Sequence, residues 1–240
     1  MNTEATGNPV AGETRQHLII DADDTLWENN IYFEQAFDEF VDFLDHSSLS
    51  GVEIRAILDE IELVNIRANG YGARNFANNM VECYRHLSER EIAPGDLDRI
   101  MKLADKIMAQ PIEIIDGVPE TLEYLASRHD LTLFTKGHAE EQKLKIERSG
   151  LGVWFGHTAI VEEKDKQSYS LLVIERGLDP ERTWMIGNSP KSDINPSLAA
   201  GLNAVFVPHD RTWHLEKTGL DEGPGRLIQV EKFADLRAHF

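Results

Sequence analysis

Between residues 111 and 208, apolar residues alternate between short continuous runs and runs with helical spacing. The continuous runs predict strands, and the helically spaced runs predict helices between them. This alternation is typical of a parallel sheet with helices on both faces, because parallel strands are joined by crossover helices. The predicted strands cover residues 131–135, 158–161, 183–186 and 204–207, and the predicted helices cover residues 119–128, 138–149, 167–176 and 191–200.

The apolar run at residues 17–20 predicts one more strand of the same sheet, because a lone strand could not bury both of its faces. From about residue 28 to residue 110, apolar residues recur at helical spacing in four successive stretches, which predict a small helical bundle. We therefore expect an α/β fold whose doubly wound parallel sheet is formed by residues 17–27 and 111–240. The helical residues 28–110 are expected to form a domain inserted after the first strand.

The chain is strongly acidic, with 42 Asp and Glu against 24 Lys and Arg among 240 residues and a formal charge of −18. This excess argues against binding to a nucleic acid polymer or an anionic membrane, where cationic side chains supply most of the affinity. No stretch reaches the roughly 20 apolar residues of a membrane span. The single cysteine, Cys83, excludes an intramolecular disulfide and a thiolate-rich zinc site. We expect a cytoplasmic protein, with residues 1–16 as a loose tail.

Residues suited to catalysis follow the predicted strands. Ligands of open parallel sheets bind outside the carboxyl ends of the strands, so we expect these side chains to gather at one edge. Each residue alone is more often part of a turn, a helix cap or the charged surface. Their shared position favours a site. They are Asp21 and Asp23 after the first strand, Thr135 and Lys136 after the second, Lys164 after the third, and Asp193 beyond the fourth.

Asp21 and Asp23 lie one residue apart, so in an extended chain their side chains point the same way. Two neighbouring carboxylates repel each other unless a cation lies between them, and Mg²⁺ takes oxygen ligands from only a few protein groups. We therefore expect Asp21, Asp23 through its backbone carbonyl, and Asp193 to hold Mg²⁺. Asp21 can then act as a nucleophile, while a protonated Asp23 donates to the leaving oxygen.

Phosphoryl oxygens would bind Thr135 and the ammonium of Lys164. Lys136 either adds a contact to the phosphate or remains a surface charge. In the helical region, the loop at residues 70–72 is either a substrate contact or a plain turn. The nearby Asn75, Asn78 and Asn79 face either the site or the solvent.

These motifs resemble those of the haloacid dehalogenase superfamily over about residues 17–208. The family's four motifs are an apolar strand followed by Asp-x-Asp-x-Thr, a strand ending in Thr or Ser, a Lys after the next strand, and a glycine-led acidic loop. In this chain they correspond to residues 18–26, residues 131–137, Lys164 and residues 185–194.

The resemblance implies Asp21 as nucleophile, Asp23 as general acid and base, Thr135 and Lys164 as phosphate binders, and Mg²⁺ held partly by Asp193. It also implies that the helical insertion is a type-1 cap that closes over the site and helps to select the substrate.

Two residues depart from the family pattern. Asp24 stands where the family usually has Gly, and acidic residues at this position occur in nucleotidase-like members. Asn188 stands where the family usually has Asp. An amide carries no charge, so we expect Asn188 to weaken metal binding while Asp193 sustains catalysis.

We therefore expect a Mg²⁺-dependent phosphomonoester hydrolase that acts on a small phosphorylated metabolite through a phospho-aspartate at Asp21. A phosphomutase differs only in its phosphate acceptor, whereas a haloacid dehalogenase has no obvious use for Asp23. A non-catalytic phosphate-binding relative is the alternative suggested by Asn188. A signalling receiver domain would share the acids and the Lys but would lack the helical insertion. Oligomeric state and protein partners stay open at this stage.

Overall fold

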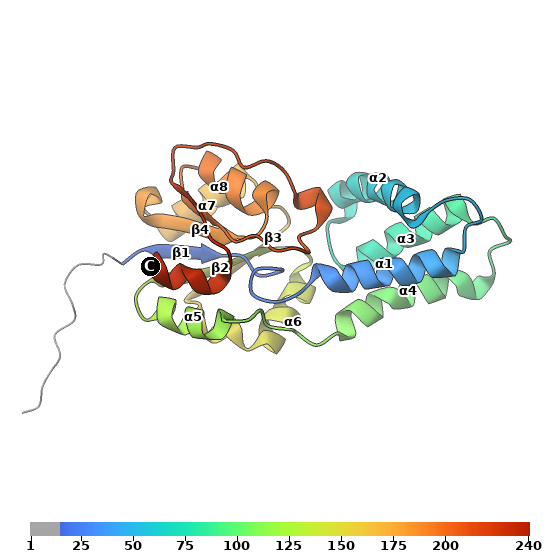
Figure 1. The fold of residues 1–240 in the computed structure, drawn as a ribbon, viewed down its shortest axis with the longest axis horizontal. Helices are drawn as coiled ribbons and strands as arrows, with labels where there is room; N and C mark the ends of the chain where they lie inside the picture. The colour runs from blue at the N-terminus through green and yellow to red at the C-terminus, as the bar shows by residue number, and fades with distance from the viewer. Residues whose placement is uncertain (1–14) are drawn as a thin grey trace, which may run out of the picture.

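The computed structural model describes residues 15–240, so most of the expected tail lies outside the described residues. Six parallel strands form one sheet in the order β3-β2-β1-β4-β5-β6 (Figure 1). The strand that carries the first acidic motif therefore lies in the middle of the sheet. The strands are β1 (His17–Ile20), β2 (Asp130–Lys136), β3 (His157–Val161), β4 (Thr183–Gly187), β5 (Asn203–Phe206) and β6 (Leu227–Gln229).

Helices cover both faces of the sheet, because successive strand residues point to opposite sides. Leu18 and Ile20 face an apolar cluster that includes Val118 and Leu122, whereas Ile19 faces a second cluster that includes Tyr169. In Figure 1, α5 and α6 lie on one side of the strands and α7 and α8 on the other. The fold class predicted from the sequence is confirmed. These helices are α5 (Val118–Ala126), α6 (Ala139–Ser149), α7 (Lys166–Arg176) and α8 (Asn195–Ala199).

Four helices follow β1 before the chain returns to the sheet, and they pack around an apolar cluster of their own. Ser50 caps the second of them in a capping box with Glu53, which fixes where that helix begins. Cys83 lies buried in this cluster, and burial raises the pKa of its thiol to about 12, as suits a core residue. The helices are α1 (Asn30–Leu44), α2 (Gly51–Asn69), α3 (Ala73–Leu87) and α4 (Pro94–Ala109).

The structure differs from the sequence-based elements in two places. The edge strand β6 was not predicted, because its three residues carry no apolar alternation and its partner β5 supplies the pairing. The single helix expected over 191–200 is divided into a wide π-type turn at Pro190–Ile194 and the short α8. Pro196 has no backbone N–H to bond to Ser192, whose carbonyl instead accepts a hydrogen bond of 2.9 Å from the Tyr169 hydroxyl.

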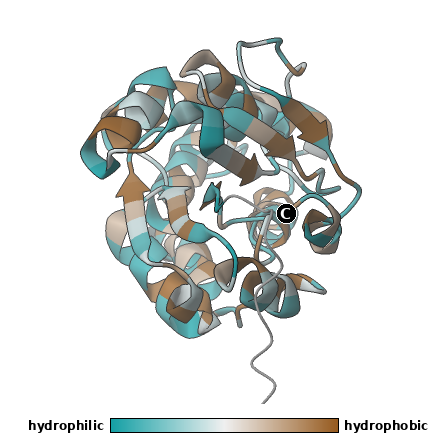
Figure 2. Cartoon of the chain, turned by 90° about the vertical axis from the view of Figure 1, so that its left-hand side faces the viewer, coloured by the Kyte–Doolittle hydropathy of each residue, from teal (hydrophilic) through white to brown (hydrophobic). Residues whose placement is uncertain are grey.

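Figure 2 shows hydrophobic segments along the strands and alternating hydrophobic and hydrophilic stretches on the surrounding helices. This distribution is the one expected for amphipathic helices packed on a buried sheet. Among the described residues, no helix is both long enough and apolar enough to cross a membrane. At the N-terminal end of the described chain, Arg15 and Gln16 contact Asp130 at the start of β2.

Candidate active site

Three charged side chains from three different strand ends meet beyond the carboxyl edge of the sheet. The ammonium Nζ of Lys164 lies 2.5 Å from Oδ1 of Asp21 and 2.8 Å from Oδ1 of Asp193. The side chains of Lys164 and Asp193 are each 1% exposed, so this contact is shielded from water. One cavity of about 170 Å³ is lined by these residues together with Asp23 and Thr135. The sequence-predicted site residues are thus brought together around a single space.

Asp21 is held from both of its carboxylate oxygens. Its Oδ1 contacts Lys164, and its Oδ2 accepts a hydrogen bond of 2.9 Å from the Thr25 hydroxyl. The Asp21 backbone N–H donates to the carbonyl of Ile186 in β4 at 2.9 Å, which extends the sheet pairing up to this residue. The carboxylate that follows β1 is therefore fixed in position relative to the sheet.

Asn188 completes a polar chain behind Asp21. The Thr25 hydroxyl also lies 3.2 Å from Oδ1 of Asn188, and Nδ2 of Asn188 donates to the Thr212 hydroxyl at 2.8 Å. The Thr212 hydroxyl donates its own hydrogen to the carbonyl of His209 at 2.9 Å, so it can only accept a hydrogen bond from residue 188. An amide meets this requirement and a carboxylate does not, which gives a local reason for Asn at this position.

The Asp23 carboxylate contacts a different ammonium from the one beside Asp21. Nζ of Lys145 lies 2.6 Å from Oδ2 of Asp23, and Nε1 of Trp27 and Nε2 of Gln142 donate to the two oxygens at 2.8 and 2.9 Å. Burial by itself raises the pKa of Asp23, but Lys145 and the two hydrogen bonds outweigh it and lower the pKa. In this structure the environment favours the ionised form of Asp23 rather than the protonated form expected from the sequence.

Thr135 and Lys136 stand at the end of β2 and both line the cavity. Thr135 is 1% exposed. The ammonium of Lys136 donates to the Ser192 hydroxyl at 2.7 Å and to Oε1 of Glu216 at 2.8 Å. Burial lowers the pKa of Lys136, but the charge of Glu216 in particular raises it overall. Lys136 is therefore charged and forms an ion pair with Glu216, which lies 80 residues further along the chain.

Asp193 reaches Lys164 because the fourth motif begins with a glycine. The backbone N–H of Ser189 donates to Oδ2 of Asp193 at 2.9 Å. A Cβ at Gly187 would lie 2.5 Å from Cγ and 2.9 Å from Cβ of Asp193, which is too close for any side chain. Burial, followed by the charge of Asp21, raises the pKa of Asp193 to about 7 against the opposing effect of Lys164.

The donor set at this edge fits a hard divalent cation. Asp21 and Asp193 offer carboxylate oxygens that already share one ammonium, and both residues line the cavity. The mutual repulsion that raises the pKa of Asp193 would be relieved by a cation between the two acids. Because Lys145 contacts the Asp23 side chain, the backbone carbonyl of Asp23 is the group that we expect this residue to offer to a metal.

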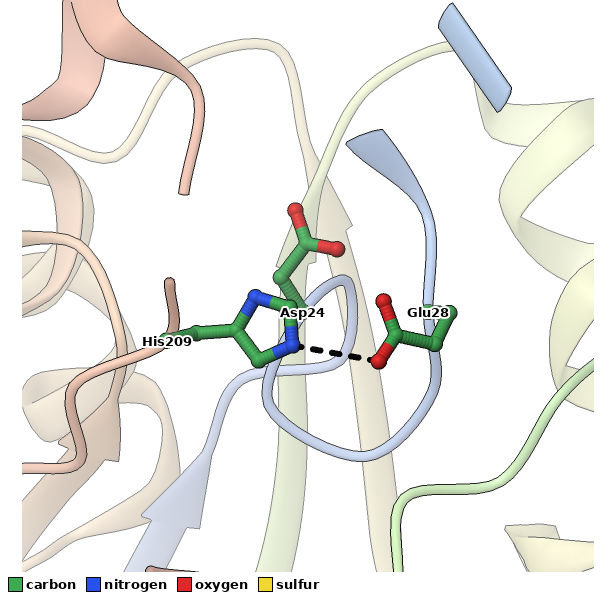
Figure 3. A group of neighbouring side chains, drawn as sticks. All are labelled: Asp24, Glu28 and His209. Atoms are coloured by element: carbon green, nitrogen blue, oxygen red, sulfur yellow. Dashed lines mark hydrogen bonds and ion pairs between the residues drawn. The ribbon is translucent and has the colours of Figure 1, made fainter. Parts of the chain in front are cut away.

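A second group of possible metal ligands lies beside the first motif but is not the predicted set. Ligand atoms of Asp24, Glu28 and His209 lie within 4.8 Å of one another, and Nε2 of His209 is 3.3 Å from Oε1 of Glu28 (Figure 3). Oδ1 of Asp24, however, accepts hydrogen bonds of 2.8 and 3.1 Å from the backbone N–H groups of Asn29 and Asn30. These bonds place a carboxylate at the first turn of α1, where the helix dipole favours negative charge.

Asp24 also adopts a backbone conformation that usually requires glycine. Its φ is +59°, in the left-handed region, which explains why glycine is the usual residue at this position of the motif. The hydrogen bonds to the start of α1 compensate for this strain. The departure from the family pattern therefore has a structural role at the junction between the first motif and the helical region.

A sequence model of the haloacid dehalogenase-like hydrolases matches residues 16–201 of the chain. The chain belongs to this family. A solved haloacid dehalogenase-like family hydrolase from Xanthomonas campestris is 32% identical, with a TM-score of 0.82, and the match covers 95% of this chain and 91% of that one. The family resemblance inferred from the four motifs is thus confirmed.

Two relatives of the hydrolase carry names that state an activity. Pyrimidine 5'-nucleotidase PynA of Streptococcus pneumoniae is 31% identical over 117 residues, which are 45% of this chain and 48% of that protein. The phosphoserine phosphatase of Thermus thermophilus is 23% identical over 190 residues, which are 74% of this chain and 70% of that protein. The chain therefore spans about half the length of the nucleotidase that it matches.

Several residues around the hydrolase site were missed by the sequence argument. Lys145 and Gln142 lie three residues apart on one face of α6, a spacing that sequence can show, but only the fold reveals that this face meets Asp23. Glu216 reaches Lys136 from 80 residues away. The loop at residues 70–72, which the sequence left open between a substrate contact and a plain turn, lines the cavity, and its Tyr71 donates its hydroxyl to Oε2 of Glu163 at 2.7 Å.

Proposed function

We propose that this hydrolase cleaves phosphomonoesters, with Asp21 as the nucleophile. The observation that carries the proposal is the contact of Lys164 with both Asp21 and Asp193 inside a cavity shared with Thr135. The buried ammonium of Lys164 places positive charge beside the nucleophile, where phosphoryl oxygens would lie. The named phosphatase relatives support the same reaction class.

In the first step, an oxygen of Asp21 attacks phosphorus, a P–O bond forms to the carboxylate, and the bond to the alcohol oxygen breaks. The departing alcohol takes up one proton. Water then attacks the phospho-aspartate, losing a proton and restoring Asp21 with release of phosphate. Asp23 is our proposed proton carrier in both steps, and it can take up a proton once its contact with Lys145 loosens.

Thr135 and Lys164 would bind the phosphoryl oxygens, and Lys136 would add charge from the same rim. Asp21, the backbone carbonyl of Asp23, and Asp193 would hold Mg²⁺, which when bound neutralises charge on the phosphoryl group and on the acids.

We propose that residues 28–110 act as a cap over this site. Contacts between the two regions are specific: Glu141 of α6 accepts a hydrogen bond of 2.9 Å from the backbone N–H of Ala73, and His214 lies 2.6 Å from Asp59 of α2. The cavity is lined from both regions, so a substrate bound there would contact both of them. A small phosphorylated metabolite is the substrate class that suits a cavity of this kind.

The experiment is the release of phosphate from p-nitrophenyl phosphate with and without Mg²⁺. We expect turnover that EDTA abolishes and Mg²⁺ restores, and that Asp21→Asn reduces by at least about a thousandfold. Asp38→Asn, on an exposed position of α1, is the matched control and should keep full activity. Mass spectrometry of an acid-quenched reaction should find the phosphoryl group on Asp21. Full activity of Asp21→Asn would refute the proposal.

A further inference from the structure

The cavity continues from the catalytic acids into the helical region, where none of its lining side chains takes part in the proposed chemistry. We call this part the distal pocket. Its polar residues lie on α2 and α3 and its aromatic residues on α1 and α3. It is lined by Arg55, Glu62, Asn79, Phe33 and Phe76.

Glu62 is a buried acid without a hydrogen bond. The residue is 6% exposed, and its buried Oε2 accepts no hydrogen bond from any residue that the structure describes. The nearest positive charge, Nη2 of Arg55, stands 3.6 Å from Oε2. A buried carboxylate without hydrogen bonds is costly, and a ligand that donates to it would recover part of that cost.

Arg55 does not leave the distal pocket positively charged. Its Nε donates to Oδ1 of Asp59 at 2.9 Å, and its Nη1 lies 3.6 Å from Oε1 of Glu34. Asp59 and Glu34 alone therefore already outnumber the one guanidinium, before Glu62 is counted. An additional negative group would meet net repulsion here, so the pocket disfavours an anionic ligand group.

The remaining groups add a donor and two aromatic rings. Asn79 is 4% exposed, and its Oδ1 accepts a hydrogen bond of 3.0 Å from Nδ2 of Asn65. Its Nδ2 is the donor that Asn79, as a residue lining the cavity, can offer to a ligand. The rings of Phe33 and Phe76 meet edge to face with centroids 5.3 Å apart. Aromatic walls of this kind suit a planar ligand group.

We propose that the distal pocket binds an uncharged planar group with a hydrogen-bond donor beside an acceptor, as on the edge of a pyrimidine-type nucleobase. The donor would bond to Glu62 and the acceptor to Nδ2 of Asn79. This inference rests on the proposed function, because it assigns the alcohol part of the phosphomonoester. The preferred substrate is then a nucleoside monophosphate rather than the phosphate ester of an organic acid.

The test compares uridine 5'-monophosphate with orotidine 5'-monophosphate, whose base differs only by a carboxylate. We expect the uridine ester to have a kcat/KM at least about tenfold higher than that of the orotidine ester. Phosphate esters of organic acids, such as phosphoglycolate, should also be poor substrates, because they too carry a carboxylate. Glu62→Met, which removes the acceptor but keeps the volume, should lower kcat/KM for the uridine ester by about ten- to a hundredfold. The same variant should leave p-nitrophenyl phosphate within about threefold, because that ester has no donor for Glu62.

Glu60→Met is the matched control, since Glu60 is exposed on the same helix and should leave every substrate unchanged. At pH 8, above the pKa of about 7 that burial gives Glu62, Glu62→Gln keeps an acceptor without the charge. It should then retain most of the uridine activity and accept the orotidine ester better than wild type does. These opposite responses would not arise from a merely structural role of Glu62. Equal losses on all esters in Glu62→Met, or equal use of the two nucleotides by wild type, would overturn the inference while leaving the proposed function intact. Absence of phosphatase activity in wild type would overturn both.

Discussion

Asp21 and Asp23 lie one residue apart, yet each has its own ammonium partner. Lys164 contacts Asp21 and Lys145 contacts Asp23, so the two carboxylates do not need to share a proton. The sequence predicted an ionised Asp21 and a protonated Asp23, because two neighbouring carboxylates repel each other. The structure instead gives each acid its own lysine, and Lys145 lowers the pKa of Asp23 against the opposing effect of burial.

Glu62 should make the stability of the protein depend on pH. Burial raises the pKa of Glu62 to about 7 from an ordinary value of 4.5, against the opposing charge of Arg55. Between these two pH values the unfolded chain has lost the proton that the folded chain still holds, so the free energy of unfolding falls as pH rises. The contribution of this one group is about 3 kcal/mol at most, complete by about pH 8.

Urea unfolding of wild type and Glu62→Gln at pH 5 and pH 8 measures this effect. The variant lacks the titrating group, so its free energy of unfolding relative to wild type should rise by about 2–3 kcal/mol from pH 5 to pH 8. Glu60→Gln, on the exposed side of α2, should show a constant difference over the same range. A pH-independent difference for Glu62→Gln would show that Glu62 is not buried as the structure has it.

At the scale of elements, the loop after β4 depends on the absence of a side chain at Gly187. In Gly187→Ala the new Cβ would displace Asp193, which Lys164 and the Ser189 backbone hold in place. We expect kcat/KM to fall at least about a hundredfold, because the acid opposite Asp21 moves, and stability to fall by about 1–3 kcal/mol. Phosphatase assays and urea unfolding give the two values.

Gly95→Ala provides the comparison for this substitution. Gly95 lies in the first turn of α4, and a Cβ there would meet nothing within 4 Å. Replacing it by Ala should leave activity unchanged and stability equal or slightly higher, because Ala restricts the unfolded chain. Retention of full activity by Gly187→Ala would show that the position of Asp193 is not needed for turnover.

Most of the elements could be predicted because their signals are local. The apolar run of β1 and the helical spacing in α1 to α4 are written in consecutive residues, and so are the strand ends that carry the site. The contacts of Asp23 and Lys136 could not be predicted, because Lys145 and Glu216 approach from 122 and 80 residues away. β6 was missed for the same reason, since only its pairing with β5 makes it a strand.

At the scale of the whole molecule, the formal charge of −18 opposes the approach of an anionic substrate. The lysines and the arginine that line the cavity are already paired with acids: Lys164 with Asp21 and Asp193, Lys136 with Glu216, Lys145 with Asp23, and Arg55 with Asp59. These paired cations therefore attract an anionic substrate only at short range. The approach of the substrate from solvent is governed by the net negative charge of the protein.

Salt should consequently accelerate the encounter with substrate. Raising ionic strength from 0.01 M to 0.1 M shortens the screening length from about 30 Å to about 10 Å, so kcat/KM for a phosphate dianion should rise about two- to tenfold with KCl at fixed Mg²⁺. The value of kcat at saturating substrate is the internal control and should not change, because kcat does not depend on the rate at which substrate approaches the negatively charged protein. A fall of kcat/KM with salt would instead mean that the cations of the cavity dominate the long-range field despite their acidic partners.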